Sequence, residues 1–245
     1  MGTFGRRLLL AVDAKGYGRV DVLTQRQLQE AIQRLLGEAA AAAGLARESW
    51  ETQEGGDSVF AVLPEGASEP DLVDGFMRHL DAGLRAFNHG RLPEAWLRLR
   101  AAVHFGTASP AANGFEGRAP VEIGRMLDSV ALRAALAAAP EACLAFAVST
   151  TVFNDVIRGA YTTIRAQEFR EVRITEKEYT GRAWIRVPGY DVHALELDGA
   201  DPGVSGGGEA VDARPPNAST ASGDTVIHVF NETVHAPGSV FGISK

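Results

Sequence analysis

The chain has 245 residues, of which 45% are hydrophobic, which is enough for one large domain or a medium domain with a tail. Its formal net charge of −7 at pH 7 argues against the clustered basic surface that nucleic acid needs. No apolar stretch reaches membrane-spanning length, and the run before Asp13 is too short for a signal peptide. We therefore expect a soluble, cytoplasmic protein without a nucleic-acid or membrane partner. Its single cysteine, Cys143, is expected in the core.

The first expected element is a buried strand over Leu8–Val12, an apolar run that ends at Asp13 and is turned by the glycines that follow. A helix is expected next, over residues 23–45, because its apolar residues follow helical spacing. Thr24 is the possible cap of this helix.

Residues 49–53 and 59–63 are expected to be the two arms of a hairpin, with Asp57 in its glycine-rich turn. If this hairpin lies beside the first strand, the carboxylates of Asp13 and Asp57 converge. Such a pair forms a seat for hard divalent cations and a polyphosphate. Taken singly, Asp13 is equally explained as a loop cap and Asp57 as a turn residue.

The remaining pattern predicts alternating helices and strands up to about residue 187. We expect helices over 70–87 and 120–139, strands over 97–105 and 144–148, a helix reaching 157, and strands over 169–174 and 183–187. This order favours a single α+β sheet with helices packed on one face.

The composition changes at Asp198. Residues 198–224 are rich in glycine, proline and serine and lack apolar periodicity, which predicts a flexible linker. Residues 225–245 are β-prone and carry few charges. This tail is either a short element that pairs with a signalling partner through residues 225–243 or one more strand of the sheet.

Four stretches, in this order, resemble the motifs of class III nucleotidyl (adenylate and guanylate) cyclases. They are Val12–Gly18, Gly56–Ala61, Arg100–Gly106 and Gly117–Arg125. The resemblance covers roughly residues 7–190 and suggests a divergent bacterial member. It implies that residues 1–197 form the ferredoxin-like cyclase fold, with a central, mostly antiparallel sheet and helices packed on it.

The resemblance also implies the chemistry of the site. Asp13 and Asp57 would bind Mg²⁺ or Mn²⁺, with the backbone carbonyl of Ala14 completing one metal site. Arg125 aligns with the arginine that stabilises the transition state, and Lys177 falls near the phosphate-binding lysine. The alternatives are a surface arginine on a helix and, since glutamates flank Lys177, a solvated turn lysine.

Three positions depart from the family pattern. Val121 replaces the asparagine that positions the ribose, Gln53 replaces the base-reading lysine, and Gly114 replaces its acidic partner. The amide of Gln53 still offers a donor and an acceptor to a base edge, and the space at Gly114 suits a differently shaped base, as in pyrimidine-cyclising relatives in antiphage defence. Loss of activity is the other explanation, because orienting the attacking hydroxyl supplies much of such a rate enhancement.

The resemblance therefore suggests a phosphorus–oxygen lyase that converts a nucleoside triphosphate to a cyclic mononucleotide at a head-to-tail homodimer interface. The alternative is a catalytically degenerate module, an adaptor or effector in bacterial signalling or defence. Its tail, around 231–242, resembles amyloid-like signalling motifs. A diguanylate-cyclase-like polymerase, suggested by Gly55–Asp57, lacks the acidic-aromatic continuation. His104 has no ligand partner at metal-binding spacing and is expected to be a hydrogen-bonded core histidine.

Overall fold

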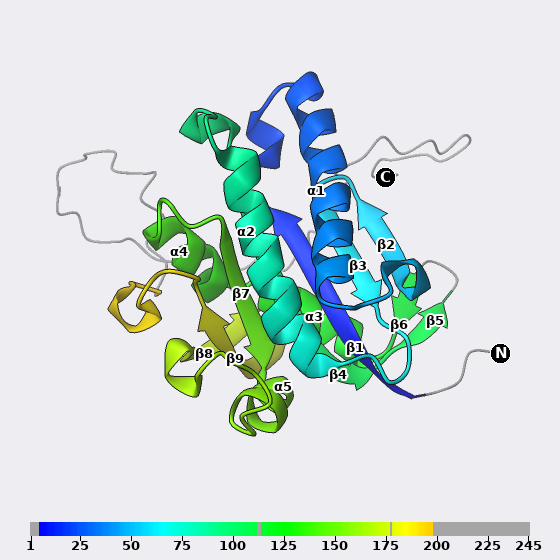
Figure 1. Ribbon diagram of the computed structural model, residues 1–245. Coiled ribbons are helices and arrows are strands. Elements are labelled where there is room, and N and C mark those ends of the chain that lie inside the picture. The colour runs from blue at the N-terminus through cyan, green and yellow to red at the C-terminus, as the bar shows by residue number, and fades with distance from the viewer. Residues whose placement is uncertain (1–4, 112–113, 177, 198–245) are drawn as a thin grey trace, which may run out of the picture. The chain divides into compact units, whose positions relative to one another are not determined.

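The computed structural model describes residues 5–111, 114–176 and 178–197 (Figure 1). Lys177, the predicted linker 198–224 and the predicted tail 225–245 lie outside these described residues. All the described residues fall within one compact unit of the chain.

A mixed sheet forms the centre of the described part of the chain. Its seven strands run in the order β2–β3–β1–β4–β7–β9–β8. Their bounds are Arg6–Ala14 (β1), Glu51–Gly55 (β2), Ser58–Val62 (β3), Leu99–Thr107 (β4), Leu144–Ser149 (β7), Arg170–Glu176 (β8) and Tyr179–Arg186 (β9). In this described sheet β4 and β7 are parallel and every other neighbouring pair is antiparallel. The expected mostly antiparallel sheet is thus confirmed.

Helices connect these strands, together with several short turns. The α-helices are Val22–Ala42 (α1), Met77–Asn88 (α2), Arg118–Leu127 (α3), Val130–Ala138 (α4) and Thr150–Val152 (α5). Short 3-10 turns span Tyr17–Arg19, Arg47–Ser49, Pro93–Ala95, Ala166–Glu168 and Val192–Ala194, and π-helical turns span Asp71–Phe76 and Phe153–Ile157. Among the described helices, none has both the length and the apolar character that a bilayer crossing requires.

Helices cover both faces of the sheet, so the expectation of helices on one face is wrong. Along β1, Leu8 and Leu10 join the core under α1 and α2, whereas Leu9 and Ala11 join the core under α3 and α4. Figure 1 shows α1 and α2 crossing in front of the sheet. The reason lies in the strand sequence, because a strand buried on both faces has an uninterrupted apolar run.

The predicted third helix, 120–139, is in fact two helices separated at Ser129. This residue has an extended backbone, its hydroxyl accepts a hydrogen bond from the amide of Leu132 at 3.3 Å, and it donates to the carbonyl of Met126 at 2.8 Å. Serine is a strong N-cap and restarts the helix at a new angle. The predicted role of Thr24 is also wrong, because Asp21 caps α1 through the amides of the two residues after Val22.

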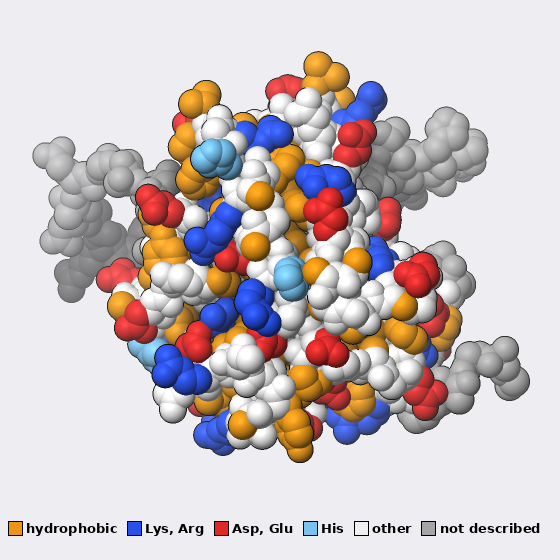
Figure 2. Space-filling model, in the orientation of Figure 1, with side chains coloured by type: hydrophobic (Ala, Val, Ile, Leu, Met, Phe, Trp, Pro, Cys, Tyr) orange, Lys and Arg blue, Asp and Glu red, His pale blue; other side chains and the backbone are white. Residues whose placement is uncertain are grey.

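The outer surface of α1 and α2 carries interspersed acidic and basic side chains (Figure 2). Some of them form ion pairs one helical turn apart, such as Arg34 with Glu38 at 2.8 Å and Arg85 with Asp81 at 2.9 Å. The first of these pairs is exposed on both sides and contributes little to stability, whereas the carboxylate of Asp81 in the second is largely shielded. The apolar faces of both helices are instead buried against the sheet.

Candidate functional site

The two predicted metal ligands lie at the same end of the sheet. Strands β1 and β3 are antiparallel neighbours, and Asp13 lies opposite Ser58, the residue that follows Asp57. The backbone amide of Ala14 donates a hydrogen bond to the backbone carbonyl of Asp57 at 3.1 Å. Gly56, with a φ of 58°, forms the tight turn that places Asp57 here. The structure therefore brings Asp13, Ala14 and Asp57 together.

The Asp13 carboxylate is desolvated and lies near both acidic and basic groups. Burial raises the pKa of Asp13 above its ordinary value, and the nearby carboxylates of Asp57 and Asp128 raise it further. The guanidinium of Arg100 acts in the opposite direction and lowers this pKa. Two acidic neighbours around a desolvated carboxylate favour the approach of a cation.

Arg100 is a site residue to which the sequence motifs assigned no role. It lies on β4 directly opposite Asp13 and forms an ion pair with Asp13 Oδ2. Its Nη1 atom also donates to the carbonyl of Leu127, at the carboxyl end of α3, at 3.3 Å. The side chains are only 12% and 19% exposed for Arg100 and Asp13. Its role could have been found only from the pairing of β1 with β4, because the register of that pair determines which residue lies across from Asp13.

The donor atoms at this end of the sheet match the chemistry of a hard divalent cation. Asp13, Asp57 and the carbonyl of Ala14 all offer oxygen ligands, which Mg²⁺ and Mn²⁺ accept. Within the described residues, no cluster of three or more acidic, histidine or cysteine side chains could hold a metal by itself. Mg²⁺ is usually held by one or two carboxylates together with substrate phosphates. The residues therefore fit a metal site that a triphosphate completes.

The two predicted base-binding positions are in contact. Gln53 lies on β2, and Gly114 begins β6 (Gly114–Glu116), the second strand of a short hairpin with β5 (Ser109–Ala111) that the sequence did not predict. A Cβ atom at Gly114 would collide with the flexible amide of Gln53. Phe60 and Phe115 pack with ring centroids 5.3 Å apart and hold this hairpin against β3. A cavity of about 580 Å³ is lined here by Glu51, Thr52, Gln53, Pro110, Gly114 and Phe115.

Val121 and Arg125 lie one turn apart on α3. Val121 is 54% exposed, which is high for a large apolar side chain. Arg125 lies in the last turn and is partly buried, and its Nε atom has no hydrogen-bond partner in the described part of the chain. An unpaired buried donor is unfavourable by about 1–3 kcal/mol, so this guanidinium retains capacity for an acceptor such as a phosphate oxygen.

His104 is buried and paired, as expected for a core histidine. Its Nε2 atom lies 3.0 Å from Glu122 Oε2, and Arg118 donates to the other oxygen of Glu122 at 2.6 Å. Burial lowers the pKa of His104, and the carboxylate of Glu122 opposes that shift. The pair joins β4 to α3 next to Val121 and helps to position that helix.

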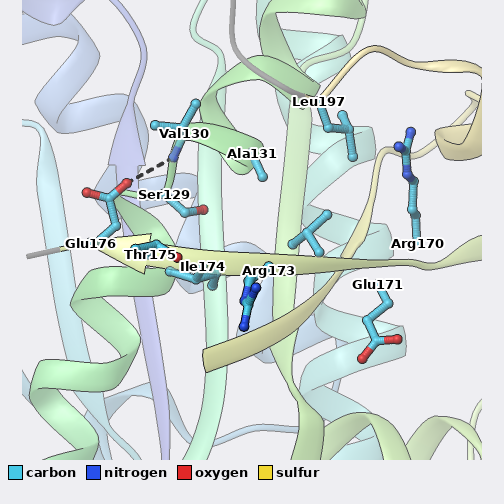
Figure 3. Close-up of a pocket in the computed structure, with 11 residues that line it drawn as sticks. Ser129, Val130, Ala131, Arg170, Glu171, Arg173, Ile174, Thr175, Glu176 and Leu197 are labelled. Carbon is cyan, nitrogen blue, oxygen red and sulfur yellow. Dashed lines mark hydrogen bonds between the residues drawn. The ribbon is translucent and has the colours of Figure 1, made fainter. Parts of the chain in front are cut away.

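A second cavity, of about 430 Å³, lies between the start of α4 and the edge strand β8 (Figure 3). It is lined by Ser129–Ala131, Arg170–Glu176 and Leu197. The Oε1 atom of Glu176 accepts a hydrogen bond from the amide of Val130 at 3.2 Å, so the first turn of α4 already has an acidic partner. None of the predicted site residues that the structure describes lines this cavity. It is therefore separate from the candidate site.

Comparisons with known proteins identify the fold. No protein-family model matches the chain, and no curated protein matches it. The adenylate/guanylate cyclase/hydrolase from Silicibacter pomeroyi matches with a TM-score of 0.55 at 16% identity, over 77% of this chain and 99% of that one. The guanylyl cyclase Cya2 matches with a TM-score of 0.51 at 11% identity, over 80% and 98% of the two chains. The GTP-bound guanylate cyclase domain of RhGC from Catenaria anguillulae gives 0.50 at 12% identity, over 74% and 95%. The chain thus has the predicted cyclase fold.

Proposed function

We propose that this chain is a divergent class III nucleotidyl cyclase that converts a nucleoside triphosphate to a cyclic mononucleotide. The observation that supports this proposal most directly is the convergence of Asp13 and Asp57 at the ends of neighbouring strands. The negative charge of Asp57 also raises the pKa of Asp13, although burial of Asp13 is the larger cause. Paired carboxylates at this place in a cyclase fold are suited to triphosphate chemistry.

Each of these groups has a part in the proposed reaction. Asp13, Asp57 and the carbonyl of Ala14 would hold Mg²⁺ or Mn²⁺. When bound, such ions neutralise phosphate charge and lower the pKa of the attacking 3′ hydroxyl. Arg125, and in the undescribed part Lys177, would donate to the phosphate oxygens as charge develops on them. The 3′ hydroxyl loses its proton to solvent, and its oxygen forms a new bond to the α-phosphorus. The bond between the α-phosphorus and the oxygen that bridges to the β-phosphorus breaks, and pyrophosphate leaves.

Two further features belong to this proposal. The cavity beside Gln53 and Gly114 would hold the base, with the Gln53 amide as both donor and acceptor to the base edge. The active unit would be a homodimer in which Arg125 of one copy serves the carboxylates of the other. This arrangement accounts for a guanidinium whose Nε atom has no partner among the described residues.

The test is incubation of the purified protein with each of the four nucleoside triphosphates and Mn²⁺, followed by identification of the product by mass. We expect one triphosphate to give a cyclic mononucleotide, and Asp13→Asn and Asp57→Asn to abolish it. The matched control is Asp71→Asn, which removes an exposed carboxylate from the π-helical turn that precedes α2. The absence of cyclic product from all four triphosphates at high protein concentration would exclude this function.

A second candidate function is a catalytically degenerate module that acts as an adaptor or effector through residues 225–243. Two observations favour it: an exposed apolar side chain at Val121, and the neutralisation of Asp13 by Arg100. Thermal-shift measurements separate the candidates, because a ligand that binds only the folded state raises its melting temperature. The degenerate module predicts little Mn²⁺-dependent shift with any triphosphate, whereas the cyclase predicts a large shift with one.

A further inference from the structure

We infer that Arg100 is an internal counter-ion of the candidate metal site, which holds Asp13 in the free chain and competes with a divalent cation for its carboxylate. The inference rests on the proposed function, because it takes Asp13 as a metal ligand. It adds a residue that sets the affinity for the cation.

The contact between the two side chains is built into the sheet. Strands β1 and β4 pair antiparallel over nine residues, and this register places Arg100 directly across from Asp13. The ion pair uses Nη2 of Arg100 and Oδ2 of Asp13, and both side chains are largely buried. A guanidinium keeps its charge at every ordinary pH, so Asp13 always has a cationic partner in this state.

The remaining bond of Arg100 restricts where it can move. Its Nη1 atom donates to the carbonyl of Leu127, at the end of α3 and two residues after Arg125. When Asp13 binds a cation, the guanidinium is repelled by the new charge but remains tied to α3. Metal binding therefore exchanges one cation for another at Asp13, and this exchange weakens the link between β1 and α3.

The local charges explain why the exchange still favours a cation. Asp57 lies at the same end of the sheet as Asp13, and Asp128 directly follows Leu127, whose carbonyl accepts a hydrogen bond from Arg100. Arg133 pairs with Asp128 at 2.9 Å but on an exposed surface, where such a contact is weak. A divalent ion carries twice the charge of Arg100 and can contact Asp13 and Asp57 together. Arg100 thus lowers the affinity for the cation without abolishing it.

The experiment measures Mn²⁺ binding directly, by electron paramagnetic resonance of free Mn²⁺ and by calorimetry, without any substrate. We expect Arg100→Gln to bind Mn²⁺ about tenfold or more tightly than the parent chain, because Arg100 and the cation compete for one largely buried carboxylate, where charges interact more strongly than on the surface. The matched control is Arg85→Gln, which removes an arginine paired with Asp81, a similarly shielded carboxylate on the opposite face of the sheet. This control should bind Mn²⁺ as the parent does.

Two more variants keep the test decisive. Asp13→Asn should eliminate the gain, so that Asp13→Asn with Arg100→Gln binds no more tightly than Asp13→Asn alone. Arg100→Lys keeps the charge and guards against misfolding, but its compact ammonium lacks the planar fork with which the guanidinium bonds both Asp13 and the Leu127 carbonyl. It should give an intermediate gain of about threefold.

The outcomes separate this inference from the proposed function. Parent and Arg100→Gln chains that bind Mn²⁺ equally well would overturn the inference and leave the metal site standing. Weaker binding by Arg100→Gln would also overturn it and would make Arg100 a support for the ligand geometry. Failure of both chains to bind Mn²⁺ at millimolar concentration, even with a nucleoside triphosphate present, would remove the proposed function and the inference together.

Discussion

Asp13 and Arg100 face each other across β1 and β4 and form a largely buried ion pair under the carboxyl end of α3. The pair joins the predicted metal site to the helix that carries Arg125. Activity should therefore depend on the position of α3 as well as on the carboxylates. The predictions below test the groups on that helix, the base cavity and the buried histidine.

Replacement of Arg125 by alanine should lower kcat by about 10²–10³-fold, with a smaller change in KM, because the loss of one donor to developing charge has that effect. The control is Arg26→Ala, which removes an exposed arginine on α1. Equal kcat values for the two variants would make Arg125 a surface arginine. Mixing the inactive Asp57→Asn and Arg125→Ala chains should restore part of the activity if the site is shared between two copies.

Introduction of asparagine at Val121 should raise turnover about tenfold, since a hydrogen bond that orients the reacting ribose contributes through geometry. Val121 is exposed, so this change should alter the free energy of unfolding by less than about 0.5 kcal/mol. Steady-state kinetics with the preferred triphosphate measure the effect. If turnover falls instead, the ribose is oriented by a different group, and Val121 is suited to the native substrate.

Gly114→Ala should weaken nucleotide binding as well as lower stability. Gly114 has a φ of 112°, and the added methyl group would displace the amide of Gln53 from the cavity. Gly66→Ala is the matched control, because Gly66 has a φ of 78° and open space around it. Each substitution should destabilise the fold by about 1–2 kcal/mol. Affinity for the preferred triphosphate should fall about tenfold for Gly114→Ala alone, and equal affinities would place the base elsewhere.

The buried pair of His104 and Glu122 predicts a loss of stability at acidic pH. Burial lowers the pKa of His104 below its ordinary value of 6.5, so the folded chain disfavours the protonated imidazole. Its contribution is present above pH 6.5 and is lost as the pH falls through the lowered pKa. Urea unfolding at about pH 7.5 and about pH 5 should show a larger loss for the parent chain than for His104→Gln.

Glu122→Gln gives this prediction its internal check. The carboxylate of Glu122 favours the protonated imidazole and so opposes the effect of burial. Its removal should make the loss of stability at acidic pH larger than in the parent chain. A smaller loss of stability would mean that the carboxylate of Glu122 affects the pKa of His104 more than burial does, which would contradict this prediction.

Local sequence signals predicted much of the fold. The apolar run of β1 and the glycine-rich turn at Asp57 each determine their own structure, so both strands of the hairpin lie close to their expected positions. The break at Ser129 was missed because alanine and leucine on both sides favour helix and one capping residue is a weak signal. The placement of α3 and α4 on the second face of the sheet was not predicted, because a continuous apolar strand was not interpreted as buried on both faces.

The position of a site residue could be predicted only where the sequence immediately around it determines that position. Asp13 and Asp57 follow from strand ends and turns, whereas the partner of Asp13 depends on which strand lies beside β1 and in what register. Arg100 was therefore visible within a motif but had no assigned role. The contact of Gln53 with Gly114 depends in the same way on a hairpin of two three-residue strands, which leaves almost no pattern in the sequence.

The most direct measurement of the central claim is the stoichiometry of the products that form with Mn²⁺ and the preferred triphosphate. Cyclisation predicts one pyrophosphate for each cyclic mononucleotide, with neither product formed by Asp57→Asn or after removal of the metal by a chelator. Release of phosphate with a nucleoside diphosphate would indicate hydrolysis. Hydrolysis, or activity of the Asp57→Asn chain equal to that of the parent chain, would contradict a cyclase that uses Asp13 and Asp57 as its metal ligands.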